Sequence, residues 1–329
     1  MTKRDQLGLF ASQLQAVITE RDRELAKTLP KFLRFGTSSW TFPGWGGVLY
    51  AGKPSAEELV RDGLKAYASH PLFRTVGIDR SYYGPLTDAD LGEYARALGG
   101  VDFLAVSKVW DELTTVVFPH HPRFGDRAGR RNPDFLSPER FLDEVLAPYT
   151  RSFAQYTGPF VFEIPPVPEG ALPSDRAIPD AIERLLVRLP STFRYSFELR
   201  NRELLTRRYF DVLRAHRAAH CFNMWTAMPP VGRQLELPGS ITTDFAVCRL
   251  MLPPATRYDA MKKAFAPFDK IVRVEPDMRS DVVRLEEACA KLEVQGLFVL
   301  VNNKAEGSSP LTVKALAEAI VRARDPAEA

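Results

Sequence analysis

The chain has few cysteines and no long apolar run. Its 329 residues include only Cys221, Cys248 and Cys289, which lie far apart and are odd in number. We therefore expect neither a disulfide framework nor a CxxC metal site, and buried free thiols are the simpler interpretation. The first part of the chain lacks an apolar stretch typical of a signal peptide, and no later segment approaches a membrane span. The sequence thus predicts a cytoplasmic protein without membrane contact.

An excess of charge of either sign is also missing. Lysine and arginine number 44 and aspartate and glutamate 41, for a formal net charge of +3, so composition gives no argument for a nucleic-acid or membrane partner. The exception is local: residues 120–131 combine histidines and arginines with Phe124, and such basic–aromatic mixtures bind phosphates and stack bases. A nucleic-acid-associated protein that uses this insertion is therefore an alternative, with stacking surface added by aromatic residues at strand ends: Trp40, Trp45, Tyr82, Tyr83 and Trp110. A solvated basic loop with ordinary core aromatics is the preferred interpretation.

Several catalytic signatures are absent as well. No GxGxxG follows the first apolar run, and neither GxSxG nor GxxxxGK[ST] occurs. There is no HxH or HExxH pair, and none of the five histidines ends a predicted strand. We therefore expect no cofactor and no metal site of the usual nitrogen–oxygen type, with a carboxylate-held Mg²⁺ as the alternative left open.

The sequence does contain a regular alternation of short apolar runs and amphipathic stretches. The runs are rich in Val, Ile, Phe and Tyr, and they occupy residues 32–39, 73–83, 102–110, 159–166, 192–200, 219–225, 245–252 and 296–303. Between them, apolar residues recur every three or four positions, as on one face of a helix. Parallel strands joined by crossover helices follow from this pattern, and eight of them favour a TIM-barrel-like (β/α)8 barrel over an open doubly wound sheet.

A segment of different character precedes the first apolar run. Residues 1–30 predict an N-terminal helical extension that packs on the main domain or on a partner, and residues 31–325 predict a single barrel domain. The apolar residues at roughly helical spacing in this extension are Leu7, Phe10, Leu14, Val17 and Ile18.

Six short motifs follow one another along the chain. They are GTSSWTFPGWGGVLY, TVGIDRSYYGP, FLAVSKVWDELTT, FVFEIPP, FELRNRELL and LFVLVNNKAEGSSPLTVKAL. Their order resembles that of the YecE-like family (domain of unknown function 72), from about Arg34 to about Ile320. The resemblance implies a TIM-barrel-like fold and does not imply an activity.

The chain departs from the motifs of that family at five positions, one of which is the glutamine before the paired prolines, displaced by Glu163 in FEIPP. The glutamate and asparagine of the second motif are replaced by Gly77 and Asp79, and the histidines of the third and fifth motifs by Thr115 and Asn201. The resemblance therefore indicates a divergent member, and an activity that depends on those side chains does not carry over to it.

Polar side chains at the ends of the predicted strands supply the candidate site, because the carboxyl ends of barrel strands meet at one mouth. Charges in apolar strands are costly unless they are paired. The residues selected on these grounds are Glu198, Asp79 and Lys108 as catalytic candidates and Arg200, Tyr83, Asn302 and Trp40 as ligand-binding candidates.

These residues can be given roles if the mouth binds a small anionic or polyhydroxyl ligand. Lys108 and Arg200 then anchor an anionic group, because an arginine forks onto carboxylate or phosphate. Glu198 or Asp79 is the candidate for proton transfer, while Tyr83 and Asn302 orient the ligand, with the oligomeric state left undetermined.

Each role has a structural alternative. Glu163 and Glu198 end consecutive strands and can form a carboxylate pair of the kind used in glycoside hydrolysis, but two arginine-paired carboxylates are the preferred interpretation. The charges as a set can instead plug the barrel of a non-catalytic scaffold. Trp40 and Trp45 can line the mouth or cap the core, and the core is slightly preferred.

Overall fold

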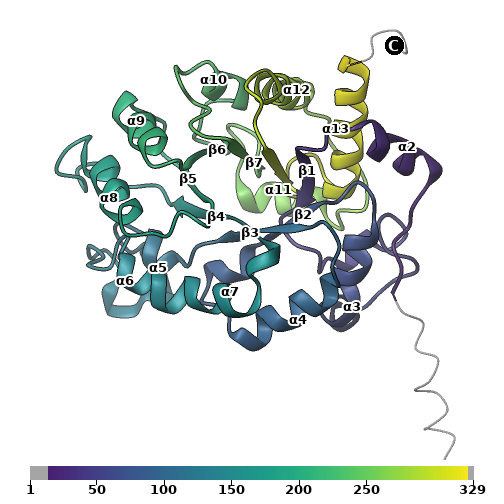
Figure 1. Cartoon of the computed structure of the whole chain (residues 1–329), viewed down its shortest axis with the longest axis horizontal. Coiled ribbons are helices and arrows are strands. Elements are labelled where there is room, and N and C mark those ends of the chain that lie inside the picture. Colours follow the sequence, from purple (N-terminus) through teal and green to yellow (C-terminus); the bar gives the residue numbers. More distant parts are fainter. Residues whose placement is uncertain (1–13, 325–329) are drawn as a thin grey trace, which may run out of the picture.

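Eight parallel strands form a nearly closed barrel with helices around it in the computed structural model, which describes residues 14–324 (Figure 1). The strands are β1 (Leu33–Thr37), β2 (Thr75–Ile78), β3 (Leu104–Lys108), β4 (Thr157–Ile164), β5 (Tyr195–Leu199), β6 (Ala219–Met224), β7 (Phe245–Leu250) and β8 (Gly296–Val301). They follow one another in the order β1-β8-β7-β6-β5-β4-β3-β2. Between β1 and β2, a parallel bridge joins Phe35 to Phe73. This architecture confirms the predicted TIM-barrel-like (β/α)8 fold.

Helices lie before the first strand, between the strands and after the last one. They are α2 (Glu20–Thr28), α3 (Ala56–Ser69), α4 (Asp88–Leu98), α5 (Asp111–Thr114), α6 (Pro138–Arg140), α7 (Ala147–Ser152), α8 (Ala177–Leu186), α9 (Arg207–Ala215), α10 (Val231–Leu235), α11 (Tyr258–Phe265), α12 (Pro276–Lys291) and α13 (Ser309–Arg324). Capping boxes at Ser55 and Thr87 fix the starts of α3 and α4. Within residues 14–324, no helix is both long and apolar enough to cross a membrane.

The interior of the barrel is a packed apolar core. Its buried residues are Val106, Val161, Ala219, Cys221, Phe245, Val247, Phe298 and Leu300. Side chains two positions apart on a strand point the same way. Lys108, Glu163 and Arg249 each come two residues after one of these inward-facing valines, so the strand period itself places three charges on top of the apolar core.

Within residues 14–30, the N-terminal segment is helical over a shorter range than the sequence predicts. The helix α2 begins only after Thr19, whose extended backbone and side chain cap it. Before it, Ala16 pairs with Tyr50 in an antiparallel bridge, and Val17 N–H donates to the Leu49 carbonyl at 2.8 Å. The helical prediction is therefore wrong for Leu14, Val17 and Ile18, because backbone pairing with the loop after β1 holds this stretch extended; Leu7 and Phe10 lie outside the described residues.

Helix α2 packs against α13, beside the barrel. Lys314 of α13 contacts the Asp22 carboxylate at 2.9 Å, and His70 Nε2 lies 3.7 Å from its other oxygen. Asp22 is almost fully buried. The extension is thus joined to the barrel by a buried ion pair as well as by apolar contacts.

Candidate functional site

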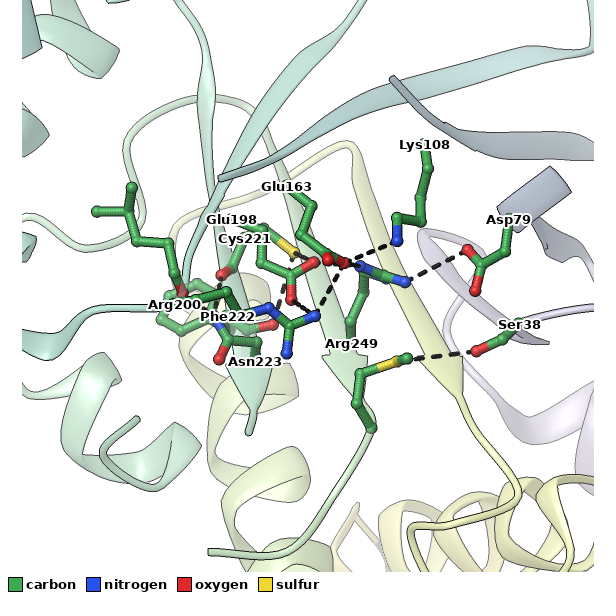
Figure 2. A network of polar contacts seen from close by, with 12 residues as sticks. Ser38, Asp79, Lys108, Glu163, Glu198, Arg200, Cys221, Phe222, Asn223 and Arg249 are labelled. Carbon is green, nitrogen blue, oxygen red and sulfur yellow. Dashed lines mark hydrogen bonds and ion pairs between the residues drawn. The ribbon is translucent and has the colours of Figure 1, made fainter. Parts of the chain in front are cut away.

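Six charged side chains meet at the carboxyl ends of the strands (Figure 2). They come from five different strands or the turns that follow them. The six are Asp79, which opens the short 3₁₀ helix η3 (Asp79–Tyr82), and Lys108, Glu163, Glu198, Arg200 and Arg249. Three are cations and three are carboxylates, so the formal charges of the cluster balance.

Arg249 is the centre of this ion-pair network. Its side chain is 1% exposed, and its Nη1 donates to Glu163 Oε2 at 2.7 Å and also to Glu198 Oε2. Its Nη2 lies 3.3 Å from Asp79 Oδ1. Burial alone would lower the pKa of Arg249, but Glu198, Asp79 and Glu163 together hold that pKa well above its ordinary value. A permanently charged guanidinium therefore crosslinks three carboxylates inside the barrel.

Glu163 accepts from three cations through one oxygen. Besides Arg249, Lys108 Nζ lies 3.0 Å and Arg200 Nη2 2.9 Å from Glu163 Oε2. Burial raises the pKa of Glu163, but the charges of Arg200, Lys108 and Arg249 outweigh it and hold the pKa well below the ordinary value. Glu163 is therefore ionised and, although it was not among the selected candidates, it contacts more of the network than Asp79 does.

Glu198 lies at the bottom of the network. It has no exposed surface, and its Oε1 is 2.6 Å from Arg200 Nη2. The Cys221 thiol is 4.0 Å from its other oxygen, and burial followed by the charge of Glu198 raises the pKa of that thiol well above its ordinary value. The arrangement is that of the arginine-paired carboxylates preferred from sequence, and Glu198 faces the core side of the cluster rather than the solvent side.

The solvent side of the network is formed by Asp79, Lys108 and Glu163. The Asp79 side chain is 29% exposed, against 11% for Lys108 and 12% for Glu163. The Lys108 ammonium lies 3.6 Å from the centre of the Tyr82 ring, and the neighbouring Tyr83 is 71% exposed. These groups, rather than Glu198, are the ones that a molecule at the mouth can reach.

Arg200 has hydrogen-bond capacity that the network leaves unused. Its guanidinium lies over the Trp225 ring, 4.0 Å from the ring centre, and is nearly fully buried. One nitrogen, Nη2, contacts both glutamates, whereas Nε and Nη1 find no hydrogen-bond partner among residues 14–324. Unsatisfied buried donors are rare in proteins, so this arginine is a polar group that an additional acceptor would stabilise.

The structure separates two of the selected ligand-binding residues from the network. Trp40 is 5% exposed and packs edge-on against Tyr94, so it lies in the core between the barrel and its helices. Asn302 follows β8, on the opposite side of Asp79 from Lys108 in the order of the strands, and its Oδ1 accepts from the Lys304 backbone N–H at 3.1 Å. The second tryptophan of the motif, Trp45, contacts this region, because its Nε1 donates to Asn303 Oδ1 at 3.0 Å.

A cavity of about 170 Å³ lies where β1 and β8 end. Lys304 and Lys262 both line it, together with Asn302. Lys304 and Lys262 were not selected from the sequence. The sequence feature that pointed to Lys304 was its position two residues after Asn302. In a loop, however, no strand period predicts which way a side chain points.

The basic insertion after β3 is held by its own ion pairs. Arg123 pairs with Asp111, and Arg127 contacts the two carboxylate oxygens of Glu112 at 2.5 and 2.6 Å. The guanidinium of Arg123 also lies 4.5 Å from the centre of the Phe124 ring. Two of the arginines behind the nucleic-acid alternative thus have carboxylate partners and fix the loop to the start of α5.

The carboxylates of the network are engaged by cations and not gathered as metal ligands. Within the part of the chain that the structure describes, no group of three or more histidine, cysteine, aspartate or glutamate side chains is arranged to hold a metal ion. What the network offers is a fixed set of charged donors and acceptors at the edge of the mouth.

Comparisons with known proteins agree with this architecture. A structure of a DUF72 family protein from Enterococcus faecalis superposes with a TM-score of 0.59 at 14% identity, covering 88% of this chain and 95% of that one. A DUF72 family protein from Thermotoga maritima superposes with a TM-score of 0.56 at 19% identity, covering 87% and 98%. No curated protein matches the chain. The family model described as "Protein of unknown function DUF72" matches residues 34–328, and the chain therefore belongs to this family.

Proposed function

We propose that the carboxyl-terminal mouth of the barrel binds a small anionic or polyhydroxyl molecule, and that the protein transforms it or acts as its binding protein. The observation that carries this proposal is the partial exposure of Asp79, Lys108 and Glu163 on an otherwise buried network. In barrels of this fold the strand carboxyl ends carry the active site. Carboxylates and an ammonium held side by side can accept from and donate to neighbouring hydroxyl groups.

Asp79 is the best placed group for proton transfer. It is the most exposed carboxylate of the network, and only its Oδ1 contacts Arg249 within residues 14–324. Glu198, the other candidate from sequence, is fully buried beneath two arginines. A general acid or base must reach the atom that it protonates or deprotonates, so we assign the role to Asp79 and a supporting role to Glu198.

Lys108 and Arg200 support the binding of an anionic part. Both already contact Glu163, so a ligand anion shares them with that carboxylate. Arg200 still has two nitrogens without an acceptor in the described part of the chain. The exposed ring of Tyr83 lies at the rim, where it can cover an apolar face of a ligand.

The balanced charge of the network favours a second candidate, a non-catalytic scaffold. Three cations and three carboxylates neutralise one another, as expected for an ion-pair network that fills the top of a barrel. The two candidates differ in one respect: a scaffold needs no ligand, whereas a ligand site gains stability when the ligand is added.

A thermal-shift screen with defined compounds tests the proposal. Neutral sugars, sugar acids and sugar phosphates are added to the wild-type protein, to Asp79→Asn and to the control Glu287→Gln, whose side chain is exposed on α12. We expect at least one compound to raise the Tm of the wild type and of the control by several degrees and to have a clearly smaller effect on Asp79→Asn. A screen in which no compound raises the Tm, or in which Asp79→Asn responds like the wild type, favours the scaffold.

A further inference from the structure

The cavity between the ends of β1 and β8 combines polar side chains with the aromatic rings of Phe42, Trp45, Tyr258 and Phe268. Ser38 and Ser39 follow β1, Asn302 and Lys304 follow β8, and Lys262 reaches it from α11. Its volume of about 170 Å³ is below the roughly 300–1,000 Å³ of sites that enclose a whole drug-sized ligand. The cavity therefore suits one functional group of a larger molecule.

Lys304 is a buried cation without a counter-ion. Its side chain is only 8% exposed, yet among residues 14–324 its ammonium has neither a carboxylate partner nor a hydrogen-bond acceptor. Its ammonium lies 4.4 Å from the centre of the Tyr258 ring. Buried charges are normally paired, because burial removes their hydration. An unpaired lysine that lines a cavity is thus suited to bind an anion.

A second lysine adds to the positive charge. Lys262 is exposed on α11, lines the same cavity and has no ion pair with a carboxylate in the described part of the chain. Burial lowers the pKa of Lys304 to about 8; Asp79 opposes this change and the charge of Lys262 adds to it. The two ammonium groups thus repel each other, in contrast to the balanced network beside them, and one bound anion relieves that repulsion.

The backbone around the cavity is held in place before any ligand arrives. Helix α13 starts at Ser309, whose N–H and hydroxyl both donate to Asn303 Oδ1, at 2.9 and 2.6 Å. In the loop between β8 and α13, the fully buried Glu306 accepts two hydrogen bonds of 2.9 Å from Arg279. The positive end of a long helix and a rigid loop thus flank the two lysines.

We propose that this cavity binds a phosphate group of the mouth ligand, which makes the substrate class a polyhydroxyl compound that carries a phosphate ester. The polyhydroxyl part rests on the proposed function above, while the phosphate part rests on Lys304 and Lys262. The carboxylate of Asp79 acts electrostatically on Lys304, so the two parts of the site are neighbours in one mouth. Many TIM barrels bind phosphate with the loops after strands seven and eight and a helix N-terminus, which agrees with this position.

Titration with inorganic phosphate, followed by calorimetry, tests the phosphate part. The variants are Lys304→Met, which keeps the buried aliphatic stem, and Lys262→Gln; the matched control is Lys263→Gln, exposed on α11 next to Lys262 and outside the cavity lining. We expect saturable binding to the wild type and the control, binding weakened at least about tenfold in Lys304→Met, and a smaller loss in Lys262→Gln. Undiminished binding to Lys304→Met, or no binding to the wild type, overturns the proposal.

The fold and the two parts of the site are checked separately. Lys304→Met removes an uncompensated buried charge, so its Tm should equal or exceed that of the wild type. If this variant fails to fold, the phosphate affinity of Lys262→Gln, compared with that of Lys263→Gln, tests the proposal instead. Glycerol and glycerol 3-phosphate serve as further probes. One outcome is that Lys304→Met loses phosphate binding while the screen finds no polyhydroxyl ligand that depends on Asp79. This outcome leaves a site for free phosphate and rejects only the proposed function. A polyhydroxyl ligand that depends on Asp79 without any phosphate binding rejects the phosphate site alone.

Discussion

Glu163 of β4 and Glu198 of β5 lie directly opposite each other in the register of the barrel. Side chains opposite each other on parallel neighbours point the same way, so the fold forces two carboxylates together inside the barrel. Arg249 makes this possible, because its Nη1 binds both of them. Glu163, Glu198 and Arg249 therefore form one structural unit, whatever further role the two carboxylates have.

Loss of Arg249 should destabilise the protein strongly. Arg249→Met leaves two buried carboxylates with less counter-charge, and removing one partner of a buried ion pair typically costs about 3–5 kcal/mol. Adding Glu198→Gln to this variant should restore part of the free energy of unfolding, since the neutral amide no longer needs the guanidinium. Urea denaturation of the two single variants and the double variant measures the coupling. Strictly additive losses would contradict the geometry described for the pair.

Glu163 should make the protein sensitive to acid. Its pKa is well below the ordinary value of 4.5 in the folded state, despite burial, because Arg200, Lys108 and Arg249 surround it. The stabilisation is thus complete above about pH 4.5 and is lost as the pH falls toward the folded pKa. Glu163→Gln should be less stable at pH 7, and its free energy of unfolding should fall less steeply below pH 4.5 than that of the wild type. Glu287→Gln is the control, and equal acid slopes in all three proteins would exclude this role.

His220 should affect stability at milder acidity than Glu163, between about pH 6.5 and 4. It is fully buried between the Tyr209 hydroxyl and Gln234 Oε1, 3.1 and 3.2 Å from its ring nitrogens, and burial lowers its pKa from 6.5 to about 4. Between these pH values the unfolded chain binds the proton and the folded one does not, so stability falls as the pH drops from 6.5 to 4. The difference corresponds to roughly 3 kcal/mol.

Replacing this histidine tests that assignment. His220→Gln should start from a lower stability at pH 7 and show a flatter decline between pH 6.5 and 4, measured by urea denaturation at several pH values. His120→Gln, exposed in the insertion, is the control. A decline in His220→Gln as steep as that of the wild type would assign the effect to other groups.

The strands and the central charges were predictable because a strand has a fixed period. The run 102–110 contains Val106 and Lys108 two apart, and the structure places both inside the barrel, with Lys108 at the mouth. The same reasoning extends to Glu163 and Arg249. The sequence could not show which of these charges lie deeper, however, since the burial of Glu198 beneath the partly exposed Asp79 depends on the lengths and register of separate strands.

The loops were the part that sequence could not resolve. Trp40 and Trp45 lie five residues apart in a stretch without a period. The structure buries both, but only Trp45 also contacts Asn303 beside the cavity. Lys262 and Lys304 are 42 positions apart by number and meet only because α11 folds over the end of β8. A cavity formed in this way leaves no local pattern in the sequence.

Binding of sulfate should depend on the charge of Lys304. Sulfate keeps its double charge across the neutral and alkaline range, so a change in its affinity reports on the protein. With the Lys304 pKa at about 8, affinity should be nearly constant below pH 8 and fall by up to about tenfold per pH unit above it. The charged and titratable groups that face Lys304 are Asp79 from η3 and Lys262 and Tyr258 from α11.

Two of these neighbours should shift, in opposite directions, the pH at which sulfate affinity begins to fall. Lys262→Gln removes a repulsion and should shift the fall in sulfate affinity to higher pH, although binding at pH 7 becomes weaker. Asp79→Asn removes an attraction and should shift it to lower pH. Calorimetric titrations between pH 6.5 and 9.5 measure the midpoints, with Lys263→Gln as the control. If affinity stays flat to pH 9.5 in the wild type, or if Lys304→Met shows the same pH dependence, Lys304 is not the cation that holds the anion.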